Sequence, residues 1–283
     1  MFIFQSKNDF FNKLFFIFAK IFILISLFNI VMKIYNQLLN IISNKGAAYL
    51  ILLDPDKISI DKLSFFIPKC EKSGVDGFLI GGSLLLAGNF DEFIERVKIL
   101  TTLPVIIFPG SVNQICQKAD AILFLSFISG RNAEHLIGEH VIAAPIIKRT
   151  KIEPISTGYI LVESGPVTTA QYMNGSQPIP RNKPEIAAAT ALAAEYLGMK
   201  FIYLEAGSGA EKSVPNEMIR KVSDYCSVTL IVGGGIKSPK DAREKVESGA
   251  QIIVTGNYFE DENNWEIIKF FADAVHYKIS VEV

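Results

Sequence analysis

The chain has few cysteines, and their spacing fits neither a disulfide framework nor a metal site. Only Cys70, Cys116 and Cys226 occur in 283 residues, and no CxxC motif is present. This usage argues against a cysteine-bound zinc ion and is typical of a reducing cytosol. The three histidines form no HExxH motif, so the sequence assigns them no role in metal binding or catalysis.

An excess of charge of either sign is also missing. The chain holds 28 Lys and Arg against 29 Asp and Glu, and charged residues make up only 20% of it. Without an overall basic field, no nucleic-acid partner is expected. Hydrophobic residues make up 49% of the chain, which excludes a disordered protein and provides for a large core.

One long apolar run is present, and it lies at the N-terminus. Residues 1–31 hold 9 of the 21 phenylalanines, and the run Leu14–Met32 is broken only by Lys20, Ser26 and Asn29. About 20 apolar residues span a bilayer. Two interpretations stay open: residues 14–32 anchor the protein to a membrane, or Met32 is the true start of the chain. Both predict a separate catalytic domain over residues 32–283, placed in the cytoplasm.

After Met32, short apolar runs alternate with amphipathic segments. The runs are rich in Ile, Leu and Val and are nearly continuous, as expected of strands covered on both faces. They are Ala48–Leu53, Gly77–Ile80, Val105–Phe108, Ala121–Leu125, Tyr159–Val162, Phe201–Leu204, Thr229–Val232 and Ile252–Thr255. Helices are predicted over Asp61–Lys72, Pro184–Leu197 and Pro239–Glu247, the last with Ser238 as its N-cap.

Alternating strands and helices indicate parallel βαβ units, and eight such units in this length predict a (βα)₈ TIM barrel. An open, doubly wound sheet is the competing architecture. The connection from Phe108 to Ala121 is near the minimum for a parallel crossover, so the third helix should be short or absent. The stretch Ser164–Lys183 is predicted to be a long loop.

Glycines follow the last two predicted strands, where barrels often bind phosphate. Gly233, Gly234 and Gly235 end the seventh run, and Gly256 and Asn257 follow the eighth. Glycine lets backbone N–H groups approach an anion closely. Tight strand-to-helix turns also need glycine, but two such loops at these two strands favour a phosphate site.

Carboxylates follow other predicted strands. Asp54 and Asp56 flank a proline after the first strand and could bind Mg²⁺, with Ser83 as a neutral oxygen ligand from the next strand. An Asx turn that caps the following helix explains the same spacing. Glu163 and Glu205 end the fifth and sixth runs, so each is either a general base in the barrel mouth or a solvated rim charge.

Several blocks of sequence together resemble the geranylgeranylglyceryl phosphate synthase family, which includes bacterial PcrB-like proteins. The most specific block is Tyr203-Leu204-Glu205-Ala206-Gly207-Ser208-Gly209. The others are Leu53-Asp54-Pro55-Asp56-Lys57, Gly81-Gly82-Ser83, Val232-Gly233-Gly234-Gly235-Ile236 and Thr255-Gly256-Asn257. The likeness runs from about Met32 to the C-terminus. Residues 181–184 resemble the branch found in archaea and some bacteria.

The resemblance implies a barrel with a reduced third helix that joins geranylgeranyl diphosphate to the C3 hydroxyl of sn-glycerol 1-phosphate through an ether bond, as part of lipid biosynthesis. It implies Mg²⁺ at Asp54 and Ser83, Glu205 as the base, and a homo-oligomer. The implied glycerol phosphate site consists of Tyr203, Leu204, Glu205, Ala206, Gly207, Ser208, Gly209, Gly234, Gly235, Gly256 and Asn257. In some members a lysine two residues before the first Asp touches the phosphate. Here that residue is Leu52, so another cation or the backbone alone must supply the charge.

Two functions from other classes stay open at this stage. A phosphosugar isomerase or lyase would use the same phosphate loops with Asp54 and Glu163 as acid and base, and would need neither Mg²⁺ nor an apolar groove. A non-enzymatic barrel tethered to a membrane is favoured only by the N-terminal segment.

Overall fold

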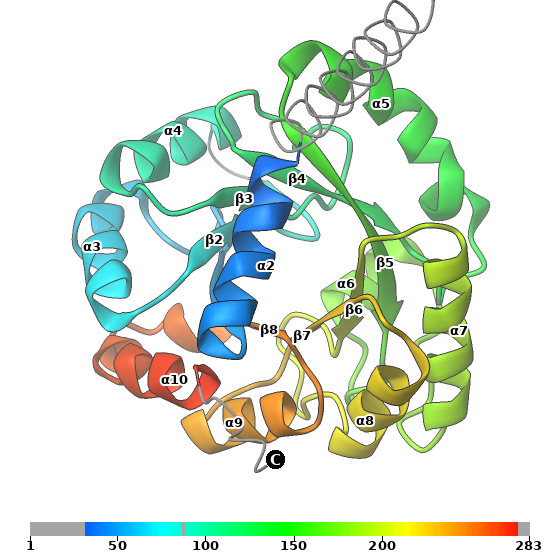
Figure 1. Ribbon diagram of the computed structural model, residues 1–283. Helices are drawn as coiled ribbons and strands as arrows, with labels where there is room; N and C mark the ends of the chain where they lie inside the picture. Colours follow the sequence, from blue (N-terminus) through cyan, green and yellow to red (C-terminus); the bar gives the residue numbers. More distant parts are fainter. Residues whose placement is uncertain (1–31, 87–88, 277–283) are drawn as a thin grey trace, which may run out of the picture.

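The computed structural model describes residues 32–86 and 89–276, and its centre is a closed barrel of eight parallel strands (Figure 1). Each strand pairs with its neighbours in chain order, and β1 closes the barrel by pairing with β8. The strands are β1 (Ala48–Leu53), β2 (Gly77–Ile80), β3 (Val105–Ile107), β4 (Ala121–Ser126), β5 (Glu153–Leu161), β6 (Phe201–Glu205), β7 (Thr229–Gly233) and β8 (Ile252–Thr255). The predicted TIM barrel is confirmed, and the open sheet is excluded.

Helices pack around the outside of the barrel. They are α3 (Leu63–Ser73), α4 (Phe90–Leu100), α5 (Glu139–Thr150), α7 (Pro184–Tyr196), α8 (Asn216–Tyr225), α9 (Pro239–Glu247) and α10 (Ile268–Val275). Within the fully described connection 108–120, no helix joins β3 to β4, as the length of this connection predicted. Short helical turns complete the set: η1 (Ile60–Lys62), η2 (Glu134–Gly138), η3 (Asn257–Phe259) and η4 (Glu262–Ile267).

Alternate residues of each strand serve two different cores, because successive side chains point to opposite faces. Along β1, Ala48 and Leu50 point into the barrel, whereas Tyr49 and Ile51 pack beneath the helices. The outer core includes Phe66 of α3, whose ring centre lies 4.8 Å from that of Trp265 in η4. Both faces of the strands are therefore buried, which explains their continuous apolar sequences.

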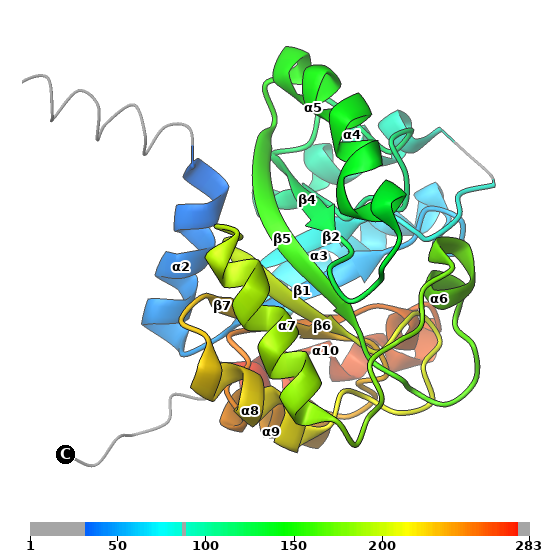
Figure 2. The same ribbon diagram turned by 90° about the vertical axis from the view of Figure 1, so that its right-hand side faces the viewer.

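Helix α2 (Lys33–Lys45) covers one end of the barrel, and the short helix α6 (Thr169–Asn174) lies at the other end (Figure 2). Ile34 and Leu38 of α2 belong to the interior core and close the N-terminal ends of the strands. Glu153, at the start of β5, accepts hydrogen bonds from the N–H groups of Ile34 (2.7 Å) and Tyr35 (2.9 Å). Only the end near α6 is therefore left for a binding site.

The structure differs from the sequence-based prediction in and after β5. The strand begins at Glu153, six residues before the predicted start at Tyr159, because it pairs along all of β4. The predicted loop 164–183 contains α6 and a bridge between Val162 and Ile179. The stretch is therefore folded back over the barrel mouth rather than irregular throughout.

Within residues 32–86 and 89–276, no helix is long and apolar enough to cross a membrane. The apolar run over residues 14–32 falls outside the described residues, except for Met32. The choice between a membrane anchor and an early start site therefore stays a prediction.

Candidate active site

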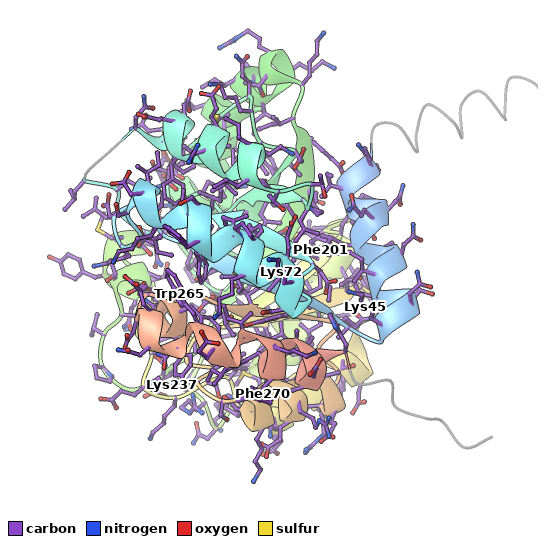
Figure 3. The ribbon with its side chains drawn as sticks, turned by 90° about the vertical axis from the view of Figure 1, so that its left-hand side faces the viewer. Lys45, Lys72, Phe201, Lys237, Trp265 and Phe270 are labelled. Atoms are coloured by element: carbon purple, nitrogen blue, oxygen red, sulfur yellow. The ribbon has the colours of Figure 1, made fainter. Side chains whose placement is uncertain are left out.

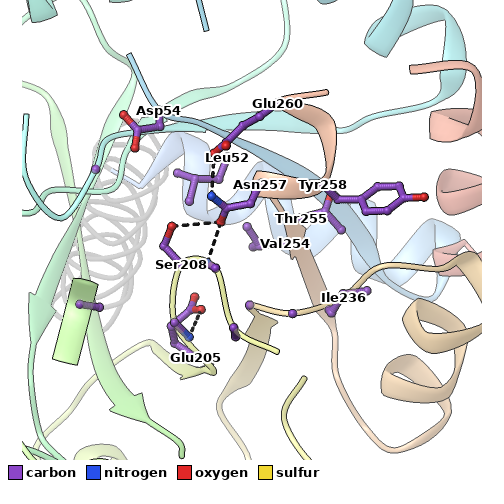
Figure 4. A pocket seen from close by; sticks show the side chains of 18 of the residues that line it. Leu52, Asp54, Glu205, Ser208, Ile236, Val254, Thr255, Asn257, Tyr258 and Glu260 are labelled. Atoms are coloured by element: carbon purple, nitrogen blue, oxygen red, sulfur yellow. Dashed lines mark hydrogen bonds between the residues drawn. The ribbon is translucent and has the colours of Figure 1, made fainter. Parts of the chain in front are cut away.

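A cavity of about 310 Å³ opens at the C-terminal ends of the strands (Figure 4). Most of the predicted site residues line it: Asp54, Ser83, Tyr203, Glu205, Gly207, Ser208, Gly209, Gly234, Gly235, Gly256 and Asn257. Leu204 and Ala206 do not line the cavity; their side chains belong to the core beneath the helices. Leu204 and Ala206 therefore anchor the backbone around Glu205 to the core, and their side chains point away from the cavity.

Glu205 is the buried acid of this cavity. Its side chain is only 6% exposed, and its Oε1 accepts a hydrogen bond of 2.6 Å from the N–H of Gly207. Burial raises the pKa of Glu205 to about 7, although the Gly207 N–H and the Tyr203 hydroxyl both favour the ionised form. A carboxyl with a pKa near neutrality inside a cavity can exchange a proton with a substrate at physiological pH.

The Tyr203 hydroxyl lies beside this carboxyl. The phenol ring is fully buried and stacked on Phe108, with the ring centres 5.2 Å apart. Its hydroxyl forms no well-aligned hydrogen bond with any described residue, although it is near enough to Glu205 to affect that pKa. A buried hydroxyl without a partner is costly, so a polar ligand in the cavity is expected to bind it.

The turn after β7 presents backbone N–H groups to the cavity. Gly234 and Gly235 have φ of +80° and +69°, which side chains other than that of glycine rarely allow. A Cβ on Gly234 would overlap the Glu205 carboxylate and lie 2.8 Å from the Gly207 nitrogen. Among the described residues, no acceptor takes the N–H of Gly234, Gly235 or Asn257. Successive free N–H groups of this kind form a site for an anion.

Asn257 fixes the loop after β8 to the loop after β6 (Figure 4). Its Oδ1 accepts hydrogen bonds from the Ser208 hydroxyl (3.0 Å) and the Gly209 N–H (3.2 Å). Its Nδ2 donates to Glu260 Oε1 at 2.7 Å. The loops after β6 and β8 are therefore held together on one side of the cavity.

Asp54 faces the same cavity from β1. Its Oδ1 accepts the N–H of Asp56 at 3.0 Å, so the Asx turn considered from the sequence is present, while the carboxylate also lies against Gly82. Burial is the main reason that the pKa of Asp54 is raised, and Asp54 in turn adds to the raised pKa of Glu260. Two neighbouring carboxylates of this kind fit a bound cation.

The predicted ligand set for Mg²⁺ is small. The Ser83 side chain lines the cavity with Asp54, but Asp56 turns away and accepts the N–H of Leu86 at 2.7 Å. Among the described residues, no group of three or more His, Cys, Asp or Glu is arranged to hold a metal ion. The pair Asp54 and Ser83 fits an ion that takes most of its oxygens from substrate and water, which is how Mg²⁺ usually binds.

A second cavity of about 600 Å³ adjoins the first. Its apolar walls come from the loop after β2, from the start of α4, from the connection after β3, from β4 and the loop after it, from α5 and from α6. They include Leu84, Leu86, Phe90, Ile115, Ile122, Phe124, Leu125, Phe127, Ala143, Ile147 and Met173. The residues common to both cavities are Gly82, Ser83, Phe108, Tyr159 and Ala170, so these mark the junction. Polar side chains also line it, among them Gln114, Glu139 and His140, so the second cavity is a groove of mixed character that leads from the first.

Several lining residues were missed from the sequence. Phe108 and Tyr159 are strand residues of ordinary core composition, and only the closure of the barrel brings them together. Glu260 and Lys237 lie just beyond the glycine loops that the sequence did indicate. Glu163 is exposed and lines neither cavity, so it is the solvated rim charge of the two alternatives.

The chain is similar in sequence to a known protein family and to named enzymes. The PcrB family model matches residues 39–275. The geranylgeranylglyceryl phosphate synthase of Chitinophaga pinensis is 43% identical over 244 residues, which is 86% of this chain and 96% of that protein. The enzyme of the same name from Pyrococcus horikoshii is 44% identical over 223 residues, 78% of this chain and 87% of that protein.

A solved structure agrees with the sequence relatives. The (S)-3-O-geranylgeranylglyceryl phosphate synthase of Thermoplasma acidophilum, solved in complex with its substrate sn-glycerol-1-phosphate, superposes with a TM-score of 0.78 at 32% identity. The match covers 84% of this chain and 97% of that one. The family resemblance carried by the sequence motifs is therefore confirmed, and the chain belongs to the PcrB family.

Proposed function

We propose that the protein is a geranylgeranylglyceryl phosphate synthase: it transfers the geranylgeranyl group of geranylgeranyl diphosphate to the C3 hydroxyl of sn-glycerol 1-phosphate. One observation carries this proposal. A cavity with free backbone N–H groups and a buried carboxyl adjoins a groove about twice its volume, and many apolar side chains line that groove. This pair of adjoining sites suits one small phosphorylated polyol and one long apolar chain.

The glycerol phosphate is proposed to bind on the two glycine loops. The N–H groups of Gly234, Gly235 and Asn257 would donate to its phosphate oxygens. The Tyr203 hydroxyl and the Glu205 carboxyl lie deeper in the cavity, where the glycerol hydroxyls would lie. This placement would satisfy the buried Tyr203 hydroxyl.

Glu205 is proposed to act as the base. Its ionised form would accept the proton of the C3 hydroxyl as that oxygen forms a bond with C1 of the prenyl chain. The bond from C1 to the diphosphate oxygen breaks, and the diphosphate leaves with the bonding electrons. The phenyl rings at the junction, Phe108 and Tyr159, exclude water from the reacting carbon, so that the glycerol hydroxyl is the nucleophile available.

Asp54 and Ser83 are proposed to hold Mg²⁺ near the junction, where the ion would neutralise charge on the leaving diphosphate. Asp54→Asn keeps an oxygen for the N–H of Asp56 but removes the negative charge. We expect this variant to fold normally and to need a much higher Mg²⁺ concentration for half-maximal turnover. An unchanged Mg²⁺ requirement in a folded variant would remove Asp54 from the metal site.

The direct test of the reaction uses the full chain in detergent with geranylgeranyl diphosphate, labelled sn-glycerol 1-phosphate and Mg²⁺. The label is expected to become extractable into organic solvent, and the product to have the mass of the prenyl ether. Label that stays in the aqueous phase would contradict the proposal and favour the isomerase or lyase alternative, which has no use for the apolar groove. The homo-oligomer expected from the family resemblance stays a prediction, which light scattering of the purified protein can check.

A further inference from the structure

The charges around the polar cavity do not suit an anion by themselves. Four carboxylates line it, those of Asp54, Glu205, Glu260 and Asp261. A phosphate with up to two negative charges would be repelled by these groups unless a cation lay close by. Among the described lining residues, Lys237 is the only Lys or Arg.

Lys237 lies next to the loop that presents the free N–H groups. It follows Ile236, which is buried, and precedes Ser238, whose hydroxyl caps α9 by accepting the N–H of Asp241 at 3.1 Å. The backbone on both sides of Lys237 is therefore fixed. Lys237 and Lys45 of α2 lie at opposite ends of the molecule (Figure 3). The cavity opens at the end where Lys237 lies.

The ammonium group of Lys237 is not engaged elsewhere. It forms no ion pair or hydrogen bond with any residue in the described part of the chain. The two lysines of α9 both have acidic partners: Lys240 lies 3.9 Å from Glu244, and Lys245 lies 2.9 Å from Asp241. Lys237 lines the cavity and has no such partner among the described residues.

The wall formed by β1 presents an apolar side chain to the cavity. Lys57, beyond this strand, does not line the cavity, although it is near enough to Asp54 and Glu260 to favour their ionised forms. Leu52 of β1 lines the cavity, and its Cβ would lie 3.3 Å from a Cβ built on Gly256. The residue beside the loop after β8 is therefore apolar. Among the described lining residues, the loop after β7 therefore offers the cation for the phosphate.

We propose that the Lys237 ammonium binds the phosphate of sn-glycerol 1-phosphate and completes the anion site formed by the N–H groups of Gly234 and Gly235. This inference rests on the proposed function. It names the group that selects a phosphorylated glycerol over glycerol itself. Lys237 is a binding residue and takes no part in proton transfer.

Steady-state kinetics of Lys237→Met test the assignment. The loss of a charged hydrogen bond should raise KM for sn-glycerol 1-phosphate about 10- to 100-fold. The values of kcat and of KM for geranylgeranyl diphosphate should change less than about twofold, because those depend on other residues. Lys237→Arg should keep most of the affinity, and the matched control Lys240→Met should behave as wild type. An unchanged KM for sn-glycerol 1-phosphate, or a rise confined to the prenyl diphosphate, would overturn the proposal.

Two further readouts separate an electrostatic role from a structural one. The KM of the wild type should rise more steeply with salt than that of Lys237→Met, since only the wild type has a charge to be screened. A second substitution, Leu52→Lys, should restore part of the affinity to Lys237→Met, because it places an ammonium on the other wall. Parallel salt dependences, together with no recovery in a folded double variant, would count against Lys237 as the phosphate cation.

Direct binding distinguishes failure of this inference from failure of the proposed reaction. Calorimetry with sn-glycerol 1-phosphate and with inorganic phosphate needs no turnover. Both anions should bind the wild type and bind Lys237→Met more weakly, whether or not an ether product forms. Equal binding by the two proteins would refute the role of Lys237 even if the wild type makes the ether.

Discussion

At the scale of single residues, Glu205 combines a structural cost with a chemical role. Its carboxyl is buried among apolar groups and the Tyr203 phenol, which also has a raised pKa because it is fully buried. The protein keeps this acid at the centre of the cavity although an amide of the same size would be easier to bury. That choice is intelligible if Glu205 must lose and regain a proton during each turnover.

Glu205→Gln should therefore lower activity and raise stability at high pH. The pKa of Glu205 rises from 4.5 to about 7 on folding, so at pH 5 the folded wild type keeps the proton of this carboxyl. As the pH rises from about 4.5 to 7, the free energy of unfolding of the wild type therefore falls. This loss approaches about 3 kcal/mol above pH 7, and Gln avoids it. Denaturant unfolding should show similar stabilities near pH 4 and a more stable variant near pH 8, with kcat lower by about 100- to 10,000-fold. A variant that is less stable than wild type at pH 8 would contradict the assigned pKa.

Gly256 offers a cleaner test of the anion site than Gly234. A side chain on Gly234 would meet the Glu205 carboxylate and would need a backbone that L residues rarely adopt, so such a variant would disturb the base as well. The three atoms nearest to a Cβ on Gly256 all belong to Leu52, the closest at 3.3 Å, so Gly256→Ala should fold with a small adjustment of Leu52. We expect KM for sn-glycerol 1-phosphate to rise several-fold with little change in KM for the prenyl diphosphate. A selective effect on the prenyl substrate would mean that the two sites have been exchanged.

At the scale of elements, the sequence predicted those features that local chemistry decides. Ser238 and Pro239 begin α9 as expected, and Leu63, Phe66, Ile67 and Cys70 form the buried face of α3. The start of β5 could not be predicted, because Pro154, Ser156 and Gly158 resemble a turn until pairing with β4 straightens them. Helix α6 was missed for a similar reason. Thr168 caps it by accepting the N–H of Gln171, and Thr168 takes this position where the loop packs against Gly207.

Glu153 is expected to hold α2 on the closed end of the barrel. Its carboxylate binds two N–H groups of the first turn of α2, where a negative charge also favours the helix dipole. Glu153→Ala should lower the free energy of unfolding by about 1–3 kcal/mol while leaving kcat unchanged, because the active site is at the other end. Denaturant unfolding and steady-state kinetics of the same preparation would check both halves. A fall in kcat without a fall in stability would show that α2 communicates with the site.

At the scale of the whole molecule, the fold and the polar cavity were predictable, whereas the shape and volume of the groove were not. Eight apolar runs and two glycine loops specify a barrel and its phosphate end, because each depends on residues close together in sequence. The groove is formed by side chains from several separate segments, so its position and volume depend on how the loop after β2, the connection after β3, β4 and the helices α4, α5 and α6 pack. The exposed position of Glu163 was likewise undecided until the backbone of β5 was placed.

Residues 1–31 are predicted to be dispensable for catalysis, because all eight strands of the barrel and every residue proposed to bind substrate or metal lie after Met32. A protein of residues 32–283 should fold and keep the kcat of the full chain on detergent-dispersed substrate. If the segment is an anchor, the full chain should need detergent for extraction from membranes. If Met32 is the true start, mass spectra of the native protein should contain no peptide from residues 1–31. A folded but inactive shortened protein would show that the segment contributes to the site.

The central claim is that one cavity joins the glycerol hydroxyl to the prenyl carbon with departure of the diphosphate. The most direct test uses sn-glycerol 1-phosphate carrying a heavy oxygen isotope in its C3 hydroxyl and identifies the products by mass spectrometry. The account predicts that the heavy oxygen is retained in the ether and that the released diphosphate is unlabelled, with Glu205→Gln forming the same product far more slowly. An ether without the heavy oxygen, or the prenyl alcohol as the only organic product, would contradict it.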